Sequence, residues 1–575
     1  MSIITRYRPS PAPEPANAAD TDTTDSDTIG DRPRRGRVRR VAAGVTTALA
    51  GILVFAALVA PDQHTPLTAG VFVRIPVEGL IGAALLLVLP ARLRKIAAVA
   101  VGTFLGLLIL VQALDFGFWT FLNRQFDLIA DWGLLDDGVH FLRDAVGRAG
   151  SIAAIIAAVG FAVGVIVLLA LSVLRLSRIA ARHRVGTARG LGVLAVAWIA
   201  CAALGAQLVP GMPVAAHSQS DLVQSRALAI RASLRDQKAF AEAVKVDKYR
   251  NTPGSQMLTA LRGKDVVFSF VESYGRSALE DPQQAAIVDP ALATGAAQLK
   301  SAGFAARSGF VRSSTFGGYS WLAHSTFQSG LLIDGQQRYR NLVTTDRLTL
   351  TGSFRRAGWQ TVAVEPDNTY AWPEGDFYGY QRVLDSRTLG YAGPHFGWST
   401  MPDQYTLSAF QRLEYSKPHA PMMAEVTLTS SHTPWAPIPQ LLDWDAIGNG
   451  AVYGPQETAG KFPEQVWQDS GKVRAEYAKS VAYSVGSLTS WVQKYGNDNL
   501  VLVFLGDHQA ASIVSGQNAT HDVPITIVAH DPAVLNRMAS WGWQDGLKPS
   551  PQAPVLPMES FRDRFLATFG SQSGR

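Results

Sequence analysis

Cysteine is almost absent from this sequence of 575 residues, which contains a single one, Cys201. One cysteine excludes an intrachain disulfide framework, and it excludes metal sites built from several thiolates. Charged residues are also scarce, at 17% of the chain, and the long apolar runs between residues 41 and 210 are almost free of them. Residues 211–575 carry charge throughout, so the scarcity is local and predicts a membrane part followed by a globular part.

A large excess of basic charge is missing as well, because the formal net charge is only +6. Much of that excess lies in two short runs, at residues 32–40 and 175–189, beside apolar segments. Basic runs in such places set the orientation of membrane helices rather than bind nucleic acid. We therefore expect no nucleic-acid partner.

Five apolar segments are long enough to cross a bilayer, which needs about 20 residues: residues 41–60, 70–91, 96–117, 152–174 and 190–209. Residues 1–40 include a stretch rich in Pro, Ala, Asp and Thr and are predicted to be a disordered, cytoplasmic N-terminus. Basic residues at 92, 94 and 95 fall on the same side as the two basic runs if the segments number five. That side is then the cytoplasm, and an odd number of spans leaves the remainder of the chain outside the plasma membrane.

The outer loop after the third segment, from residue 118 onward, has mixed charge and amphipathic spacing. It is predicted to form a helix that lies on the membrane or under the globular part. Residues 211–255 have a charged, helical pattern that suits a connector helix.

Residues 256–575 alternate between apolar strand-like runs and helical segments, which predicts an α/β domain with a largely parallel central sheet. Strands are expected at residues 265–271, 359–364, 422–428, 499–505 and 524–529, and helices between them at 291–302, 349–357 and 473–495. Ligands of such sheets bind beyond the C-terminal ends of the strands.

Polar residues follow two of these strands directly. The strand DVVFSFV is followed by Glu272, and the strand NLVLVFLG is followed by Asp507 and His508. Either site alone is compatible with a solvated loop or a helix cap. Together, two carboxylates and an imidazole are suitable ligands for Mn²⁺, Mg²⁺ or Zn²⁺. The pattern therefore predicts a divalent metal site at one edge of the sheet.

These two motifs, a strand followed by Glu-Ser and a strand followed by Gly-Asp-His, resemble those of the alkaline phosphatase/sulfatase superfamily. Within it the chain most resembles membrane-anchored lipoteichoic acid synthases, a type that includes phosphoglycerol and phosphoethanolamine transferases. The resemblance covers the topology and about 300 residues of the globular part. It implies five spans, an extracytoplasmic alkaline-phosphatase-like domain and one metal ion, Mn²⁺ first, with Mg²⁺ or Zn²⁺ as alternatives. A C/S-x-P-x-R motif, which a sulfatase would need, is absent from the sequence.

The resemblance also implies a hydroxyl nucleophile on a loop that opens a helix. Residues 313–331, SSTFGGYSWLAHSTFQSGL, place Ser320 after a Gly-Gly turn at a predicted helix start, where amides and the helix dipole favour a phosphate. Ser320 matches the nucleophilic threonine of the family and would also be a metal ligand. Ser320 could instead be an ordinary N-cap, and Thr315, Ser325 and Thr326 compete with it.

Two further segments resemble substrate-binding positions of the family. His432 in SSHTPW follows a strand, and Trp372 matches a tryptophan near the headgroup, although each could have a purely structural role. Glu374 stands where the family has an arginine, which puts a phosphoglycerol donor in doubt. His521, before the last predicted strand, could be a metal ligand, a hydrogen-bond donor or a loop residue.

The sequence thus predicts a metal-dependent transferase that moves a phosphoryl-linked headgroup from a membrane lipid or lipid-linked donor to an envelope glycolipid or glycan, through a phospho-serine. One alternative is a phosphodiesterase, phosphatase or sulfatase-like hydrolase. Another is an inactive glycan-binding module, although such a module would have no need to keep the complete set of metal-binding side chains.

Overall fold

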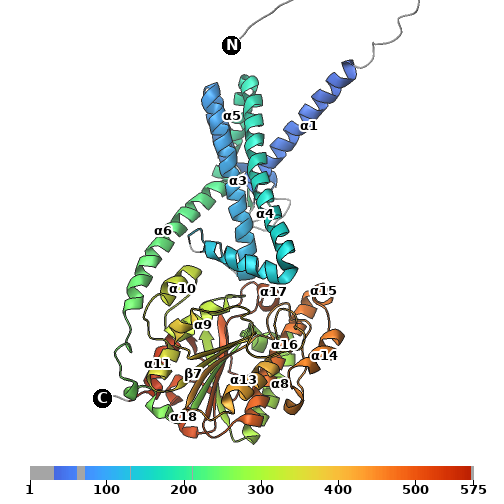
Figure 1. The fold of residues 1–575 in the computed structure, drawn as a ribbon. Coiled ribbons are helices and arrows are strands. Elements are labelled where there is room, and N and C mark those ends of the chain that lie inside the picture. Colours follow the sequence, from blue (N-terminus) through green and yellow to red (C-terminus); the bar gives the residue numbers. More distant parts are fainter. Residues whose placement is uncertain (1–31, 61–71, 123, 130, 210–211, 572–575) are drawn as a thin grey trace, which may run out of the picture.

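A computed structural model of the chain describes residues 32–60, 72–122, 124–129, 131–209 and 212–571. A group of long helices lies at one end and an α/β body at the other (Figure 1). The long-helix end contains α1 (Arg32–Val59), α2 (Val77–Val88), α3 (Ala91–Leu122), α4 (Leu134–Arg182) and α5 (Arg184–Leu204). Most of the N-terminus predicted to be disordered, residues 1–31, lies outside the described residues, and residues 32–40 belong to α1.

Four of these helices are long and apolar enough to cross a membrane, over Val38–Val59, Ala91–Trp119, Val146–Arg182 and Arg184–Leu204. They correspond to the first, third, fourth and fifth predicted segments. The second predicted segment, residues 70–91, contains α2, which has only 12 residues. A helix of that length is about 18 Å long, against a hydrocarbon core of about 30 Å. The described part of the chain therefore has four candidate spans and one shorter apolar helix.

Two prolines limit the length of α2. Pro76 belongs to β1 (Ile75–Pro76), which pairs with β4 (Ala215–Ala216), so the chain is extended immediately before the helix. At the other end Leu89 is also extended, with φ −65° and ψ 142°, because it precedes Pro90 and the proline ring disfavours the helical conformation there. Apolar composition alone does not reveal either boundary.

The helix predicted after the third segment is the first part of α4. Gly147, with φ 73° and ψ 171°, breaks α4 into a shorter N-terminal part and a long apolar part. Figure 1 shows the shorter part turned across the long helices on the side that faces the α/β body.

The predicted connector is α6 (Ser218–Lys245), which runs from the long helices to the α/β body (Figure 1). Near its start, Gln219 donates a hydrogen bond of 2.9 Å to the carbonyl of Ala57 at the end of α1. About two turns further, Arg226 forms a buried ion pair with Asp115 of α3. The connector is therefore fixed to the helical end by buried polar contacts.

The α/β body is built on a sheet of nine described strands, in the order β12-β6-β11-β10-β5-β9-β7-β8, with β13 also beside β6. The strands are β5 (Asp265–Val271), β6 (Ala305–Arg312), β7 (Gln360–Glu365), β8 (Arg382–Asp385), β9 (Met422–Leu428), β10 (Leu500–Gly506), β11 (Asp522–Ala529), β12 (Gln544–Asp545) and β13 (Val555–Pro557). Apart from this sheet, β2 (Gln207–Val209) pairs with β3 (Met212–Pro213) at the helical end.

The sheet is mixed. The five strands β10, β5, β9, β7 and β8 are parallel neighbours, whereas β11 is antiparallel to both β10 and β6. Residues 507–521 join β10 to β11 and contain only the four-residue helix α17 (Ser512–Ser515), so no long crossover helix returns the chain to the same direction. The prediction of a largely parallel sheet therefore holds only for the part formed by β10, β5, β9, β7 and β8, which contains the polar strand ends. The strands β6, β8, β12 and β13 were not predicted.

Helices cover both faces of the sheet. They are α7 (Ser277–Glu280), α8 (Pro282–Ser301), α9 (Ser320–Ser329), α10 (Gln336–Val343), α11 (Leu350–Arg356), α12 (Gly375–Tyr378), α13 (Asp403–Phe410), α14 (Gly454–Ala459), α15 (Pro463–Val466), α16 (Ser470–Tyr495), α17 (Ser512–Ser515), α18 (Pro532–Asn536) and α19 (Phe561–Phe569).

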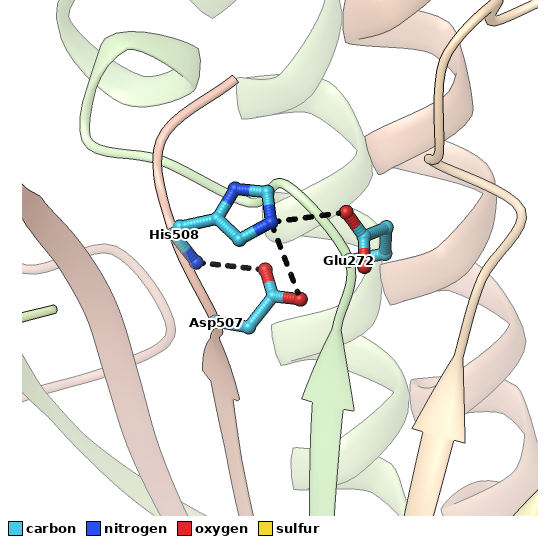
Figure 2. A group of neighbouring side chains, drawn as sticks. All are labelled: Glu272, Asp507 and His508. Carbon is cyan, nitrogen blue, oxygen red and sulfur yellow. Dashed lines mark hydrogen bonds and ion pairs between the residues drawn. The ribbon is translucent and has the colours of Figure 1, made fainter. Parts of the chain in front are cut away.

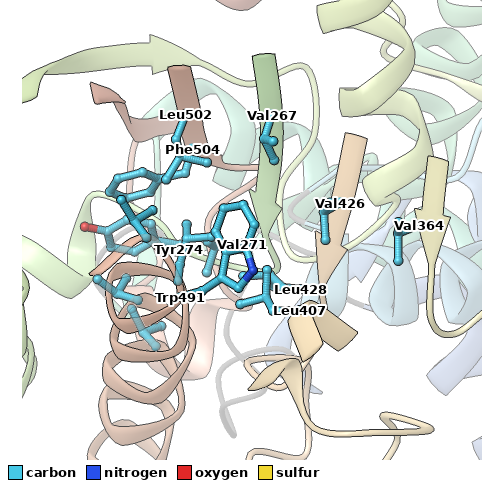
Figure 3. Close-up of a cluster of buried hydrophobic side chains, with 14 of the residues drawn as sticks. Val267, Val271, Tyr274, Val364, Leu407, Val426, Leu428, Trp491, Leu502 and Phe504 are labelled. Carbon is cyan, nitrogen blue, oxygen red and sulfur yellow. The ribbon is translucent and has the colours of Figure 1, made fainter. Parts of the chain in front are cut away.

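Buried apolar side chains from alternate positions of β5 and β10 enter two separate clusters. Val267 and Val271 of β5 pack with Trp491 of α16 on one face, as Figure 3 shows. Phe268 and Phe270 point to the other face, where α9, α11 and α19 supply the cluster. A strand buried on both faces needs apolar side chains at nearly every position, which explains the continuous apolar run of β5.

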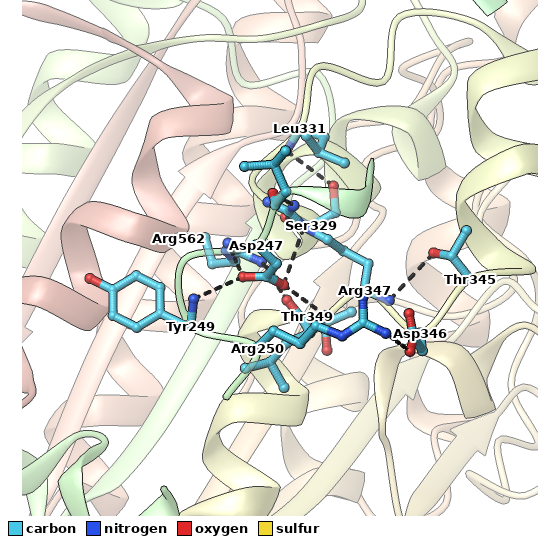
Figure 4. Close-up of polar contacts among 12 residues, drawn as sticks. Asp247, Tyr249, Arg250, Ser329, Leu331, Thr345, Asp346, Arg347, Thr349 and Arg562 are labelled. Carbon is cyan, nitrogen blue, oxygen red and sulfur yellow. Dashed lines mark hydrogen bonds and ion pairs between the residues drawn. The ribbon is translucent and has the colours of Figure 1, made fainter. Parts of the chain in front are cut away.

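A buried ion-pair network joins the end of the connector to the α/β body (Figure 4). Asp247, two residues after α6, lies 3.1 Å from Arg562 of α19 and 3.5 Å from Arg347. The side chains of all three residues are at most 4% exposed. Burial acts to raise the pKa of Asp247, but Arg562, the Tyr249 amide and Arg347 together outweigh it and hold the pKa below its usual value. The network therefore depends on an ionised Asp247.

Replacing Asp247 with alanine should destabilise the protein by about 3–5 kcal/mol, because two buried guanidinium groups lose their counter-charge. Unfolding of the full chain in detergent, followed by tryptophan fluorescence, measures this loss. The control is Asp346→Ala, since Asp346 pairs with Arg250 but is 74% exposed, and it should cost less than about 1 kcal/mol. Equal losses in the two variants would contradict a special role for the buried network.

Candidate metal and phosphoryl-transfer site

The strand register brings the polar strand ends together. In the parallel pair of β5 and β10, Val271 lies opposite Gly506, so Glu272 and Asp507 leave the sheet at the same level. Figure 2 shows Glu272, Asp507 and His508 turned toward one another beyond these two strands. Residues more than 230 positions apart in the sequence thus form one buried group.

The three side chains are close enough to hold one ion. Their ligand atoms lie within 4.8 Å of one another, and His508 Nε2 is 3.2 Å from Glu272 Oε1 and 3.8 Å from Asp507 Oδ2. Asp507 Oδ1 accepts hydrogen bonds of 2.7 Å from the amides of Ser273 and His508. Its other oxygen, Oδ2, is buried and has no hydrogen-bond partner in the described part of the chain. A buried carboxylate oxygen without a partner is costly, and a divalent cation would satisfy it.

Ser320 lies beside this group at the start of α9. Its hydroxyl donates a hydrogen bond of 2.8 Å to Glu272 Oε2, and its Oγ is 3.2 Å from His508 Nε2. The preceding residue, Tyr319, has a left-handed conformation with φ 63°, which turns the chain into the helix. Such backbone strain in a non-glycine residue persists only where the surroundings hold it.

The other hydroxyls of this segment point elsewhere. Ser325 bonds to Tyr378, and Thr326 bonds to Ser314 and to the carbonyl of Leu322. Thr315 Oγ1 is buried and makes no hydrogen bond within the described residues. Ser320 is therefore the hydroxyl of this loop and helix that contacts both Glu272 and His508.

Backbone contacts hold the loop before Ser320 against the loop after β10. The Gly317 amide donates a hydrogen bond of 2.9 Å to the Gln509 carbonyl, and the Ser313 hydroxyl donates one of 2.5 Å to the Asp507 carbonyl. Position 506 requires glycine, because a Cβ there would lie 1.9 Å from the Tyr274 carbonyl oxygen. The close crossing of the loops after β5 and β10 therefore requires a residue without a side chain at position 506.

The charges of the group depend on one another. Burial and the nearby Glu272 raise the pKa of Asp507 to about 7. Burial opposes a charge on His508, but Asp507 and Glu272 raise its pKa to about 9. Burial also opposes ionisation of Glu272, yet His508 holds the pKa of Glu272 well below its usual value. The group therefore holds protons at neutral pH that a bound metal ion would displace.

A cavity of about 260 Å³ opens beside Ser320. It is lined by two of the predicted substrate-binding residues, His432 and Trp372. The His432 ring stacks on Trp398 with centroids 4.0 Å apart, and Trp372 lies 5.4 Å from the ring of Tyr378. Glu374 and His521 are not among the lining residues, and the His521 ring packs against Phe316 at 5.5 Å.

Several lining residues were not singled out from the sequence, namely His324, Glu365, Asp367, Tyr380 and Glu425. Glu425 offered a signal, because it is a charged residue inside the otherwise apolar strand MMAEVTL. Burial raises the pKa of Glu365 to about 7; His324 opposes this shift and Glu425 adds to it. Glu365 ends β7, and His324, Asp367 and Tyr380 lie on a helix or loops, so their contact with the cavity depends on the tertiary fold.

No protein-family model and no curated protein matches the sequence. Among solved structures, the lipoteichoic acid synthase LtaP from Listeria monocytogenes is 14% identical, with a TM-score of 0.37 over 55% of this chain and 74% of that chain. The phosphoglycerol transferase GacH from Streptococcus pyogenes, solved with sn-glycerol-1-phosphate, is 15% identical, with a TM-score of 0.35 over 59% of this chain and 81% of that chain.

The soluble domain of lipooligosaccharide phosphoethanolamine transferase A from Neisseria meningitidis is also similar. It is 15% identical, with a TM-score of 0.35 over 56% of this chain and 93% of that chain. These proteins are of the type that the sequence motifs resemble. The roles of individual residues in this chain are argued from its own geometry.

Binding of a divalent cation at Glu272, Asp507 and His508 should strengthen as the pH rises through about 7 and about 9, the pKa values of Asp507 and His508. Below these values the ligands carry protons that the ion must displace. Calorimetric titration in two buffers that differ in ionisation enthalpy measures both the affinity and the protons released. An affinity that stays constant over this range, with no proton release, would contradict the assignment.

The matched variants are Asp507→Asn and Asp545→Asn. Asp507→Asn should weaken binding by more than the 10–100-fold typical of an outer-shell partner, because it removes a ligand. Asp545 is 86% exposed and pairs with Arg307, so its variant should bind like the unmodified chain.

Proposed function

We propose that this chain is a membrane-anchored, metal-dependent enzyme that transfers a phosphoryl-linked headgroup, with Ser320 as the nucleophile. One observation carries the proposal: the Ser320 hydroxyl contacts both Glu272 and His508 of a buried group suited to a divalent cation. A hydroxyl at the start of a ten-residue helix, beside such a group, is placed for attack on phosphorus.

The metal site is assigned to Glu272, Asp507 and His508, with Ser320 as a further ligand. The donor set of two carboxylates, one imidazole and one hydroxyl fits Mn²⁺, with Mg²⁺ or Zn²⁺ as alternatives. A bound ion would lower the pKa of the Ser320 hydroxyl and offset negative charge on the phosphoryl oxygens.

The reaction would proceed in two steps. Ser320 Oγ forms a bond to phosphorus as the ester bond to the lipid alcohol breaks, and the released alcohol takes up a proton that balances the one lost from Ser320. The headgroup phosphate is then held as an ester on Ser320, where the helix dipole and the amides at the start of α9 favour its negative charge. In the second step, an acceptor hydroxyl attacks the same phosphorus and regenerates Ser320.

We assign substrate binding to His432 and Trp372, which line the cavity beside Ser320. Water as the acceptor would give a phosphodiesterase or phosphatase, so the transferase and the hydrolase differ only in the second step. Anchoring of the site to membrane helices supports a lipid or lipid-linked donor and an acceptor in the envelope, a glycolipid or glycan.

We also propose that α2 is a fifth crossing, in spite of its length. Pro76 pairs with Ala216 at the end of the helical group near α6, whereas the carbonyl of Leu87 accepts a hydrogen bond from Arg184 at the opposite end. The helix α5 runs between the same two ends, from Arg184 to Leu204. Five crossings would put the N-terminus in the cytoplasm and residues 256–575, the catalytic domain, outside the plasma membrane, with residues 41–210 as the membrane domain and residues 211–255 as the connector.

Replacing Ser320 with alanine should lower turnover by about 10³-fold or more, because the nucleophile is lost. The assay uses the full chain in lipid vesicles with Mn²⁺ and a headgroup-labelled phospholipid, and it follows diacylglycerol and the labelled product. Intact-mass measurement of the unmodified chain should detect the headgroup phosphate on Ser320. Label that appears only as free headgroup phosphate, even with acceptor glycolipid present, would favour the hydrolase.

Two variants make the Ser320 experiment specific. Ser320→Thr keeps a hydroxyl and should retain part of the activity. Ser314→Ala removes a hydroxyl of the same loop that contacts Thr326, and it should leave turnover within about twofold. Full turnover in Ser320→Ala would refute the nucleophile.

Membrane topology can be tested with single cysteines in a Cys201→Ala background. Five crossings predict that Ala91→Cys, at the start of α3, reacts with a membrane-impermeant maleimide only after the cells are permeabilised. Ala60→Cys, directly after α1, and Ser571→Cys, near the C-terminus, should react in intact cells. Labelling of Ala60→Cys and Ala91→Cys on the same side of the membrane would leave α2 as a helix that does not cross.

A further inference from the structure

A second group of metal-ligand type lines the same cavity. It consists of His324 from α9, Glu365 at the end of β7 and Glu425 in the middle of β9, and the ligand atoms of these residues lie within 4.8 Å of one another. None of the three belongs to the group of Glu272, Asp507 and His508. The parallel pairing of β7 with β9 puts Val364 beside Val426, which brings the neighbouring Glu365 and Glu425 to adjacent strands.

Two of the three side chains are held firmly in place. Glu425 is 2% exposed, and its Oε2 accepts hydrogen bonds from Gln328 and, at 2.7 Å, from Tyr380. The His324 ring stacks on Phe270, with centroids 3.7 Å apart and an interplanar angle of 18°. Hydrogen bonds to the far side of a ligand orient and support it, as they do around metal ions in proteins.

Contacts within the group leave polar atoms unsatisfied. His324 Nδ1 is 3.4 Å from Glu425 Oε1, but His324 Nε2 is buried and has no hydrogen-bond partner in the described structure. Glu365 accepts a bond of 3.1 Å from the Thr427 hydroxyl. A His324–Glu425 ion pair would therefore neutralise one carboxylate and leave Glu365 without a counter-charge.

Basic side chains do not supply that counter-charge. Four acidic residues line the cavity, namely Glu272, Glu365, Asp367 and Glu425. No lysine or arginine is found among the described lining residues. Carboxylates in a largely buried wall cost free energy unless a positive charge neutralises them. An anionic phosphate ester would in addition be repelled by such a wall.

We propose that His324, Glu365 and Glu425 bind a second divalent cation, distinct from the one at Glu272, Asp507 and His508. One imidazole and two carboxylates are a donor set for Zn²⁺ or Mn²⁺, and three protein ligands are the number found in sites that keep a position open for a substrate or water. The cation itself supplies the positive charge that the wall of the cavity lacks. The role of the second cation in substrate binding rests on the proposed phosphoryl transfer, whereas the binding of the cation to the protein does not.

Metal stoichiometry tests the inference without any activity measurement. The full chain in detergent is stripped with a chelator, dialysed against Zn²⁺ or Mn²⁺ and analysed for metal content by mass spectrometry. We expect two ions per chain for the unmodified protein and one each for Glu365→Gln, Glu425→Gln and Asp507→Asn. The double variant Glu365→Gln with Asp507→Asn should bind none.

Two controls keep the result unambiguous. Glu464→Gln removes an exposed carboxylate and should still bind two ions. Thermal unfolding identifies any variant that fails to fold, and Glu365→Gln carries the test if the more deeply buried Glu425→Gln is unstable. One ion in the unmodified chain, or two ions in a folded Glu365→Gln variant, overturns the inference.

The two proposals fail in different ways. A single ion that is lost in Asp507→Asn, together with a loss of turnover in Ser320→Ala, would leave the proposed function standing and remove the second cation. Two ions in the unmodified chain with full turnover in Ser320→Ala would keep the second cation and remove the nucleophile.

Discussion

The parallel pairing of β5 with β10 is the constraint on which the rest of the site depends. Its register sets Val271 opposite Gly506, so the carboxylates of Glu272 and Asp507 emerge side by side. A shift of either strand by one residue would turn the polar side chain at its end to the other face of the sheet. Because the apolar residues of β5 alternate between two buried clusters, a shift of β5 would also exchange the side chains that pack in the two cores. The packing that stabilises the domain and the geometry of the site are therefore fixed by the same strand pair.

Around that strand pair, the loops can approach closely only because particular residues permit it. Gly506 leaves room for the Tyr274 carbonyl, and the loop before Ser320 is held by the backbone of Gln509. The Tyr477 hydroxyl of α16 donates a hydrogen bond of 2.8 Å to the Ser273 carbonyl, which fixes the loop after β5. These contacts hold Ser320 beside Glu272 at a cost in backbone strain at Tyr319.

The buried charges in and beside the cavity favour the binding of a cation rather than the stability of the free protein. Buried carboxylates in two neighbouring groups repel one another, and Asp507 Oδ2 and His324 Nε2 have no hydrogen-bond partner among the described atoms. By contrast, Asp247 at the end of the connector is matched by two guanidinium groups and supports the fold. Asp247 thus belongs to the charges that stabilise the fold, whereas the carboxylates of the cavity are arranged as ligands for a cation.

The sequence by itself determined the apolar helical half, the main strands and the residues at their ends, because each of these follows from local composition and period. It placed Glu272, Asp507, His508 and Ser320 next to strand or helix ends, and the fold brings those four together. Only the tertiary structure decided the mixed strand directions, the short α2 and the presence of His324, Glu365 and Glu425 in one cavity wall. These features depend on strand order, on pairing between distant segments and on helix packing, and none of those interactions leaves a periodic signal along the chain.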